Sequence, residues 1–260
     1  MTRSKKIFII LACLLGIGIT LAAPVAMAQQ LSLDMGSGDG TLTGRVVQML
    51  GLLTVLSLAP SILIMMTSFT RIIVVLSFLR TALGVQQTPP NTVMVSLAMF
   101  LTFFVMTPTF TTAYNDGIKP LMNQEIEESE AIDRVAEPFK AFMLAHTRDA
   151  DLGLFIELSK TEMPKQAMDT PIQVIIPAFM ISELRRAFEI GFMLFLPFLI
   201  IDMVTASILM SMGMMMLPPI MISLPFKIIF FVLVDGWHLV VGSLVKSFDV
   251  VQTAAPAVTQ

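Results

Sequence analysis

Apolar residues are concentrated in four long segments of the chain, and polar residues fill the stretches between them. Residues 46–79 are nearly all apolar but are interrupted by Pro60-Ser61 and by Arg71. About 20 apolar residues suffice for one membrane-crossing helix, so this longer stretch predicts a kinked or two-part helix that ends near Arg80. Three further apolar helices are expected at about 92–112, 187–209 and 220–245.

Proline and glycine mark the connections between these segments. Residues 84–91 contain a glycine and the pair Pro89-Pro90, which predicts a turn. The last two apolar segments are joined by residues 210–219, where Gly213 loosens the backbone and Pro218-Pro219 forbid helix continuation. We therefore expect a non-helical loop at the end of a helical hairpin.

The stretch from Asn115 to Arg186 differs in kind, because it is polar and carries 13 acidic against 8 basic residues. Residues 125–140 and 148–160 have the pattern of amphipathic helices, and we expect Pro138, Pro164 and Pro171 to separate elements. This predicts a small helical domain on one side of a membrane, whose many carboxylates form a solvated surface.

The N-terminus has the three parts of a secretory signal. Arg3, Lys5 and Lys6 form a basic region, residues 7–21 are apolar, and Ala26-Met27-Ala28 is a small-residue cleavage site. We expect cleavage before Gln29, the alternative being an uncleaved first anchor. The single cysteine, Cys13, lies inside this segment, so the mature chain would have no thiol.

Composition then narrows the class of protein. The chain is 55% hydrophobic and 13% charged, with a mean hydropathy of +0.83, whereas soluble domains carry about 25% charged residues. We therefore expect an all-α integral membrane protein. Without the three basic residues of the signal, 13 Lys and Arg face 19 Asp and Glu, which excludes a nucleic-acid-binding surface. No phosphate-binding loop, zinc spacing or nucleophile motif occurs, so neither an enzyme nor a cofactor is expected.

These observations give a domain plan. We expect a signal peptide (1–28), a flexible segment (29–44), a first membrane-associated hairpin (45–112), a periplasmic helical domain (113–186), a second hairpin (187–249) and a loose tail (250–260). Arg71 and Arg80 precede the first turn, which the positive-inside rule assigns to the cytoplasm. The acidic domain and both termini then lie in the periplasm.

Charged residues within the apolar segments are costly in a bilayer, so they should face protein or a water-filled lumen. Asp202 and Lys227 lie at similar distances before and after the tip of the last hairpin, so they can pair within it or with a neighbouring copy. Asp235 and His238 are three residues apart and are expected on one helix face. Such charges fit a static ion pair or, alternatively, a conformational or proton-coupled element.

Methionine dominates the loop that joins the last two apolar segments. The thioether side chain is flexible and polarizable, so a cluster of methionines makes a soft surface that repacks around varied shapes. A ring of such loops could seal a pore and still yield to a passing chain. The simpler interpretation is that the methionines fill gaps in the core or make an apolar turn. The methionines concerned are Met210, Met212, Met214, Met215 and Met216.

Three blocks of sequence closely resemble the FliP family of flagellar type III secretion export-gate proteins. They are PAFMISELRRAFEIGF at 177–192, TSFTRIIVVLSFLR at 67–80 continuing through QQTPPN at 86–91, and LPFK at 224–227 with VDGW at 234–237. The resemblance runs in order from about residue 45 to 249, and the signal peptide fits it too.

The resemblance implies an assembly that composition alone does not predict. Several copies of the chain, with FliQ-like and FliR-like subunits and other export-apparatus and basal-body proteins, would form a helical or ring-like channel in the inner membrane. Unfolded rod, hook and filament subunits would leave the cytoplasm through it. The family's tilted, kinked hairpins would explain the broken apolar segments.

The resemblance also assigns roles to residues. The family's methionine gasket maps onto the five methionines named above, and its buried charge pair maps onto Asp202 and Lys227. Its glutamate at the contact between copies maps onto Glu183, and its intersubunit aromatic positions map onto Phe142 and Phe155. A channel subunit is the favoured function; an ion-coupled secondary transporter using Asp202, Lys227 and Asp235 is the alternative, although no internal repeat supports it.

Overall fold

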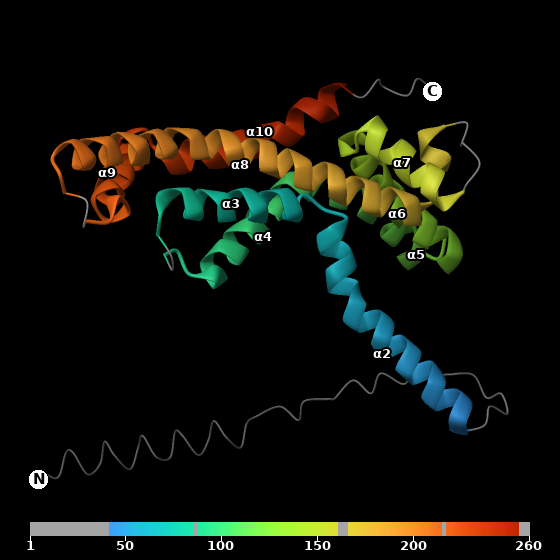
Figure 1. Cartoon of the computed structure of the whole chain (residues 1–260). Coiled ribbons are helices and arrows are strands. Elements are labelled where there is room, and N and C mark those ends of the chain that lie inside the picture. The colour runs from blue at the N-terminus through green and yellow to red at the C-terminus, as the bar shows by residue number, and fades with distance from the viewer. Residues whose placement is uncertain (1–41, 86–87, 161–165, 215–216, 255–260) are drawn as a thin grey trace, which may run out of the picture. The chain divides into compact units, whose positions relative to one another are not determined.

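The computed structural model describes residues 42–85, 88–160, 166–214 and 217–254, and every element within these ranges is helical, which confirms the all-α prediction there (Figure 1). The expected signal peptide lies outside the described residues. The elements are α2 (Leu42–Met65), α3 (Phe69–Leu83), α4 (Asn91–Ala113), the π-turn η1 (Tyr114–Ile118), α5 (Lys119–Met122), α6 (Glu128–His146), α7 (Asp149–Ser159), the 3₁₀ turn η2 (Ala167–Asp169), α8 (Ile172–Ser211), α9 (Pro219–Leu233) and α10 (Gly236–Ala254).

The chain divides into two units, residues 1–52 and residues 53–260. Of the first unit, the structure describes only the N-terminal part of α2, whose described side chains, such as Val47 and Leu50, are apolar and exposed. The second unit contains the core and every site discussed below.

The first apolar stretch forms two helices, as its length predicted, but the break lies at residues 66–68 rather than at Pro60, which is inside α2. At the break, the Thr67 hydroxyl donates to the Ile64 carbonyl oxygen at 3.2 Å and accepts from the Phe69 amide at 3.5 Å. Such side-chain bonds compete with the helical backbone pattern, and the next helix begins only at Phe69.

Helix α3 forms the centre of the second unit, because it packs against both α4 and α8. Ile72, Val75, Leu76 and Leu79 recur at helical spacing and are at most 1% exposed. The helix ends at Gly84, whose φ of 76° is the left-handed conformation that glycine adopts without strain. Residues 86–87 of the expected turn lie outside the described residues. Across it, the Arg80 guanidinium donates to the Asn91 side-chain oxygen at 2.5 Å.

Helix α8 is continuous for 40 residues, so the expected boundary between residues 186 and 187 falls inside it. Pro177 and Pro197 are both accommodated within the helix. Its first part contacts α6 and α7, and its second part runs on beside α3 toward α9 (Figure 1). One rigid element thus joins the acidic region to the last apolar hairpin.

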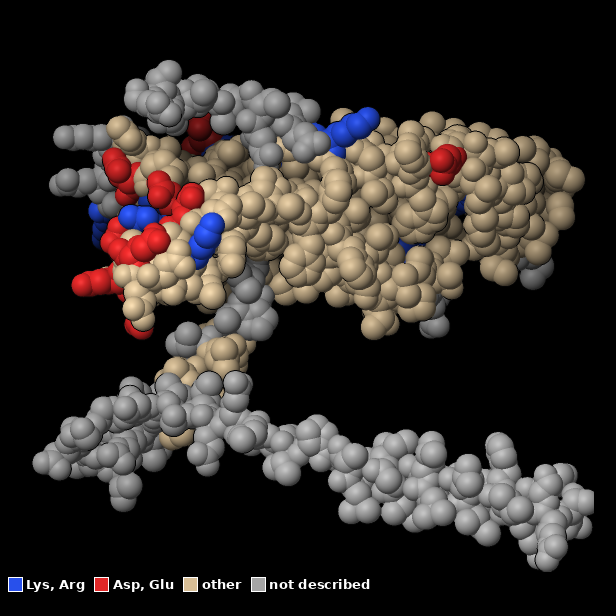
Figure 2. Space-filling view, turned by 180° about the vertical axis from the view of Figure 1, so that it is seen from behind, with Lys and Arg blue, Asp and Glu red and all other residues tan. Residues whose placement is uncertain are grey.

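The acidic region contains the two predicted amphipathic helices, now bounded as α6 and α7. Pro138 lies within α6 instead of ending it, whereas Pro171 caps the start of α8 as expected. Figure 2 shows the Asp and Glu side chains gathered over this region, while the rest of the visible surface carries little charge.

Apolar surface dominates the second half of the chain. Two helical stretches of the described chain, residues 91–122 and Ile172–Ser211, are long and apolar enough to cross a membrane, and the pair α9 and α10 makes a third if it counts as one span. Phe192, Met193 and Met203 of α8 are 64–70% exposed. Such surface requires lipid or protein to cover it, which agrees with a membrane protein.

The expected helix at 220–245 is two helices, bent by 63° at Val234-Asp235. Asp235 has a φ of 49° and lies in the turn, so Asp235 and His238 do not share a helix face, and that prediction is wrong. The physical reason lies at Gly236, where an added Cβ would come within 2.2 Å of the Phe231 ring. Only glycine allows this ring to pack over the bend.

The close approach of α3 and α8 gives the first testable prediction. At Gly191 an added Cβ would lie 2.6–3.1 Å from Cδ2, Cγ and Cβ of Phe78, and of these atoms Cβ moves only with the helix backbone. Gly191→Ala should therefore destabilise the protein, since overpacking costs about 1–3 kcal/mol against a gain of about 1 kcal/mol from helix propensity. Thermal unfolding in detergent, followed by circular dichroism, measures the change.

The matched control is Gly242→Ala in α10, where nothing lies within 4 Å of the added Cβ. This variant should be at least as stable as the wild type. Equal unfolding temperatures for the two variants would contradict the tight packing of Phe78 on α8.

Candidate functional site

The methionine-rich connection begins with a well-defined helix end. Gly213 adopts a φ of 71°, its amide donates to the Met210 carbonyl at 3.1 Å, and the Met214 amide donates to the Leu209 carbonyl at 3.0 Å. These two bonds form a Schellman motif with Gly213 at the left-handed position. Gly213 therefore ends α8 in a defined geometry, whereas the sequence analysis assigned it a loosening role.

The second half of the connection is set by proline. Pro218 is the N-cap of α9 and Pro219 its first residue, a position where the missing amide hydrogen costs nothing. Helix thus stops at Ser211 and resumes at Pro219, and Met210 belongs to the last turn of α8 rather than to the expected loop. Met215 and Met216 lie outside the described residues.

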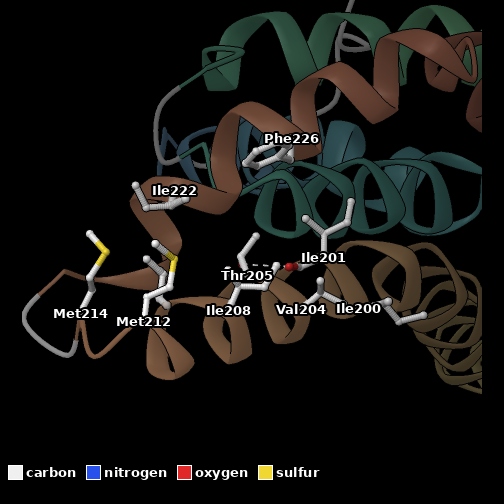
Figure 3. Close-up of a pocket in the computed structure, with 10 residues that line it drawn as sticks. Ile200, Ile201, Val204, Thr205, Ile208, Met212, Met214, Ile222 and Phe226 are labelled. Atoms are coloured by element: carbon white, nitrogen blue, oxygen red, sulfur yellow. Dashed lines mark hydrogen bonds between the residues drawn. The ribbon is translucent and has the colours of Figure 1, made fainter.

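The side chains of the described methionines in this connection are exposed on the surface of the single chain. Met210 is 64% exposed, Met212 66% and Met214 40%. Met212 and Met214 also border a hollow of about 580 Å³ between α8 and α9 (Figure 3). The other lining residues are apolar except for Thr205, namely Ile200, Ile201, Val204, Thr205, Ile208, Leu209, Ile222 and Phe226.

An ion pair lies behind this hairpin. The Lys227 ammonium donates to Asp202 Oδ2 at 2.6 Å, so the structure brings together the two charges that sit at equal depth on α8 and α9. The Lys227 side chain is 3% exposed and that of Asp202 33%. A buried ammonium needs a partner and further acceptors, because water cannot reach it.

Two further groups complete this junction, and sequence reasoning missed both. The Ser223 hydroxyl, fully buried on α9, donates to Asp202 Oδ1 at 2.7 Å. Lys227 also donates to the Ala82 carbonyl at 3.1 Å, one of the last carbonyls of α3. A cation is favourable at a helix C-terminus. Ser223 could have been found from its position four residues before Lys227, but a backbone acceptor leaves no sequence signal.

A second buried pair joins α3 to α8. Arg71 and Glu183 are at most 1% exposed, and the guanidinium binds both carboxylate oxygens, with Nε 2.8 Å from Oε2. The sequence led us to expect Glu183 at a contact between copies. Within one chain this carboxylate is enclosed and its partner is Arg71, so a direct contact with another copy stays a prediction that requires a different arrangement.

Arg71 also binds the C-terminal helix. Its Nη1 donates to the Ser247 hydroxyl at 3.0 Å, and its guanidinium lies 3.8 Å above the centre of the Phe248 ring. Stacking of Arg on an aromatic face is favourable, more so when water is excluded. Helices α3, α8 and α10 therefore meet at one side chain.

Aromatic residues surround that junction. Phe142 of α6 is 5% exposed and packs on the rings of Phe179 and Phe248, so in the single chain it is a core residue. Phe155 of α7 is partly exposed. The intersubunit roles that the family resemblance implied for Phe142 and Phe155 stay predictions, with Phe155 offering the more accessible ring.

Burial determines the protonation state of His146, which lies beside these aromatic rings and outside the membrane helices. Burial lowers the pKa of His146 to about 4, although a hydrogen bond with the Phe142 carbonyl at 2.8 Å opposes the shift. His146 is therefore neutral at pH 7. Because the unfolded histidine takes up a proton near pH 6.5, the stability contributed by this neutral ring is lost as the pH falls from 6.5 toward 4.

A second polar cluster fixes α7 against α8. Asp151 accepts hydrogen bonds from Arg148 at 2.8 and 2.9 Å and from the Ser182 hydroxyl at 2.6 Å. The hydrogen bonds from Arg148, followed by that from Ser182, lower the pKa of the Asp151 carboxyl. Ser182 precedes Glu183, so α7 is anchored one residue from the buried Arg71–Glu183 pair.

The junction behind the methionine hairpin gives the second prediction. Lys227→Met should remove the ammonium from Asp202 and from the Ala82 carbonyl, while Ser223 still donates to Asp202. Losing one partner of a buried pair costs about 3–5 kcal/mol, and the cost should lie toward the lower end because Asp202 is 33% exposed. We expect a large loss of correctly folded protein in membranes and of swimming motility. The charge swap Asp202→Lys with Lys227→Asp should recover part of both.

The outcome that contradicts this pairing is a double swap no better than either single change. Arg185→Met is the control, because its ion pair with Glu189 is 51–58% exposed and such pairs contribute little.

Comparison with known proteins confirms the family resemblance that the three sequence blocks indicated. The FliP family matches residues 52–244. The chain is 61% identical over 241 residues to the flagellar biosynthetic protein FliP of Caulobacter vibrioides, which covers 92% of this chain and 90% of that protein. It is 57% identical over 212 residues to the protein of that name from Bacillus subtilis, covering 82% and 96% of the two chains.

A third relative extends the match. The chain is 52% identical over 241 residues to flagellar biosynthetic protein FliP of Agrobacterium fabrum, covering 91% of this chain and 98% of that protein. A match of this length and identity, together with the helical membrane architecture, shows that the chain belongs to the FliP family.

Proposed function

We propose that several copies of this chain form the closed channel of the flagellar type III export gate. Unfolded rod, hook and filament subunits would cross the bacterial inner membrane through it, at the flagellar basal body. The FliP relatives support a role in flagellum biosynthesis. FliQ-like and FliR-like subunits and other export-apparatus proteins are the expected partners, and the chain itself would catalyse no reaction.

The observation that carries this proposal is the exposed methionine hairpin on an anchored base. Met210, Met212 and Met214 project from a helix end whose position is fixed by the Schellman motif and, further back, by Asp202 and Lys227. Flexible thioethers on a fixed base suit a seal, because they exclude water from a narrow ring and conform to a passing polypeptide. Met215 and Met216 would extend the same ring.

The acidic region would lie in the periplasm together with both termini, as the signal peptide and the arginines before the first turn predict. Its carboxylates, gathered over α6 and α7 (Figure 2), favour contact with water. Helix α8 would then connect this region directly to the membrane-associated hairpin, because it runs unbroken from Ile172 to Ser211.

The alternative of an ion-coupled transporter receives no support from the FliP relatives. The intramembrane charges fit a structural role better, since Lys227 binds Asp202 and the end of α3 at once. Asp235 lies in the α9–α10 turn, eight residues beyond Lys227 along the chain.

The third prediction tests the seal. Met210, Met212 and Met214 replaced together by alanine should allow assembly but leak small solutes across the inner membrane, because the apolar bulk of every copy is reduced. The measurement is uptake of a small impermeant dye by cells that carry matched amounts of the complex.

The control is Met193→Ala with Met203→Ala, which removes equally exposed methionines of α8 away from the hairpin tip. These cells should stay tight. A tight membrane with normal motility in the hairpin variant would contradict the proposed seal and leave the connection as an ordinary turn.

A further inference from the structure

We propose that Met210, Met212 and Met214 form a reversible oxidation site, at which a peroxide converts the hairpin thioethers to sulfoxides. Susceptibility of methionine follows exposure of its sulfur to the solution, and the product is polar where the reactant is apolar. The modification itself requires only the geometry of one chain. Its consequence for the membrane rests on the proposed function as a seal.

The chain contains its own comparison between reactive and protected methionines. The three hairpin methionines are 40–66% exposed, whereas Met94, Met106 and Met143 are at most 3% exposed. Methionines outside the hairpin, such as Met193 at 70% and Met221 at 68%, are equally exposed. Oxidation of a buried methionine requires local opening, whose free energy rises toward that of global unfolding in core helices. Peroxide should therefore oxidise the hairpin methionines before the buried ones.

The chemistry needs no group beyond the thioether and the oxidant. A sulfur lone pair attacks one peroxide oxygen, the O–O bond breaks as the S–O bond forms, and the departing hydroxide takes the remaining proton to become water. Sulfur is oxidised by two electrons and the peroxide is reduced to water. Reductases that act on methionine sulfoxide reverse the change.

The apolar surroundings of the hairpin mean that oxidation of these methionines should also move their side chains. Met212 and Met214 border the hollow between α8 and α9, whose walls are apolar apart from Thr205 (Figure 3). The Thr205 hydroxyl already donates to the carbonyls of Ile201 and Asp202 at 2.9 Å. A sulfoxide oxygen would find no donor in the described walls of this hollow, so it must face water, since an unpaired buried polar group is costly.

Two consequences follow for a seal built from these side chains. Each sulfoxide brings water to the ring that the thioethers keep dry, and it draws Met212 and Met214 away from the aliphatic wall they border. An oxidised gate should therefore leak, and its repair by reduction should restore the barrier. The hairpin would then report peroxide stress at the membrane.

The first experiment maps the modification in the assembled protein. Membranes that contain the full-length chain are treated with hydrogen peroxide, and sulfoxide is located by fragmentation mass spectrometry. Hairpin methionines should oxidise at least about tenfold faster than Met106 and Met143, because an opening free energy of only about 1.4 kcal/mol already gives that factor. Equal rates for hairpin and buried methionines would overturn the oxidation site.

The second experiment measures permeability with two variants of the three hairpin methionines. The leucine variant keeps the apolar bulk and cannot be oxidised, and the glutamine variant imitates a polar sulfoxide. After peroxide, wild-type cells should take up the dye, leucine-variant cells should stay tight, and glutamine-variant cells should leak without peroxide. Reductant treatment with methionine sulfoxide reductase should reverse the wild-type leak in isolated vesicles.

The two claims fail in different ways. If sulfoxide maps to the hairpin but neither oxidised wild type nor the glutamine variant leaks, the oxidation site stands and the proposed seal is overturned. If the glutamine variant leaks while the fully oxidised wild type stays tight, the seal stands and oxidation as its switch is overturned.

Discussion

The enclosed charge of Arg71 is the constraint on which the rest of the structure depends. A guanidinium that is 1% exposed cannot be hydrated, so the fold must supply an anion and further acceptors. Glu183 supplies the anion from α8, and Ser247 and Phe248 supply a hydroxyl and a ring face from α10. Because these groups come from helices far apart in sequence, the position of α8 and α10 on α3 is specified by one side chain. Replacing any of them changes how three helices meet.

A second junction fixes the opposite end of the same helix. Lys227 binds the Ala82 carbonyl near the C-terminus of α3 while it pairs with Asp202. Eleven residues separate Arg71 from Ala82, which corresponds to about 16 Å along a helix. Helix α3 thus acts as a buried spine with an ionic junction at each end. One junction holds the acidic region through α8 and its aromatic neighbours, and the other holds the hairpin that carries the methionines. A seal needs such a base, because soft side chains close a pore only when their backbone is held in place.

Local chemistry predicted much of this fold, whereas contacts between distant residues escaped it. Apolar length predicted the helices, and the equal depth of Asp202 and Lys227 on two helices of one hairpin predicted their approach. The signals at Pro60 and Pro138 misled, because α2 and α6 each continue through their proline at the cost of one backbone hydrogen bond. The break before α3 lies instead beside Thr67, whose hydroxyl binds the Ile64 carbonyl. The bend at Asp235 needed the ring of Phe231 above Gly236, a contact visible only after packing. Likewise, Arg71 and Glu183 are 112 residues apart, and the local sequence around either residue does not predict that they pair.

The central claim is that Arg71 and Glu183 act as one unit that holds α3, α8 and α10 together. A double-mutant cycle tests it most directly, with Arg71→Met, Glu183→Leu and both together, measured as the free energy of unfolding in detergent. Each single variant should lose about 3–5 kcal/mol, because it strands the other charge. The double variant should lose far less than the sum, since it removes both charges at once. Losses that add to within about 0.5 kcal/mol would show that the two residues are independent, and would contradict the account.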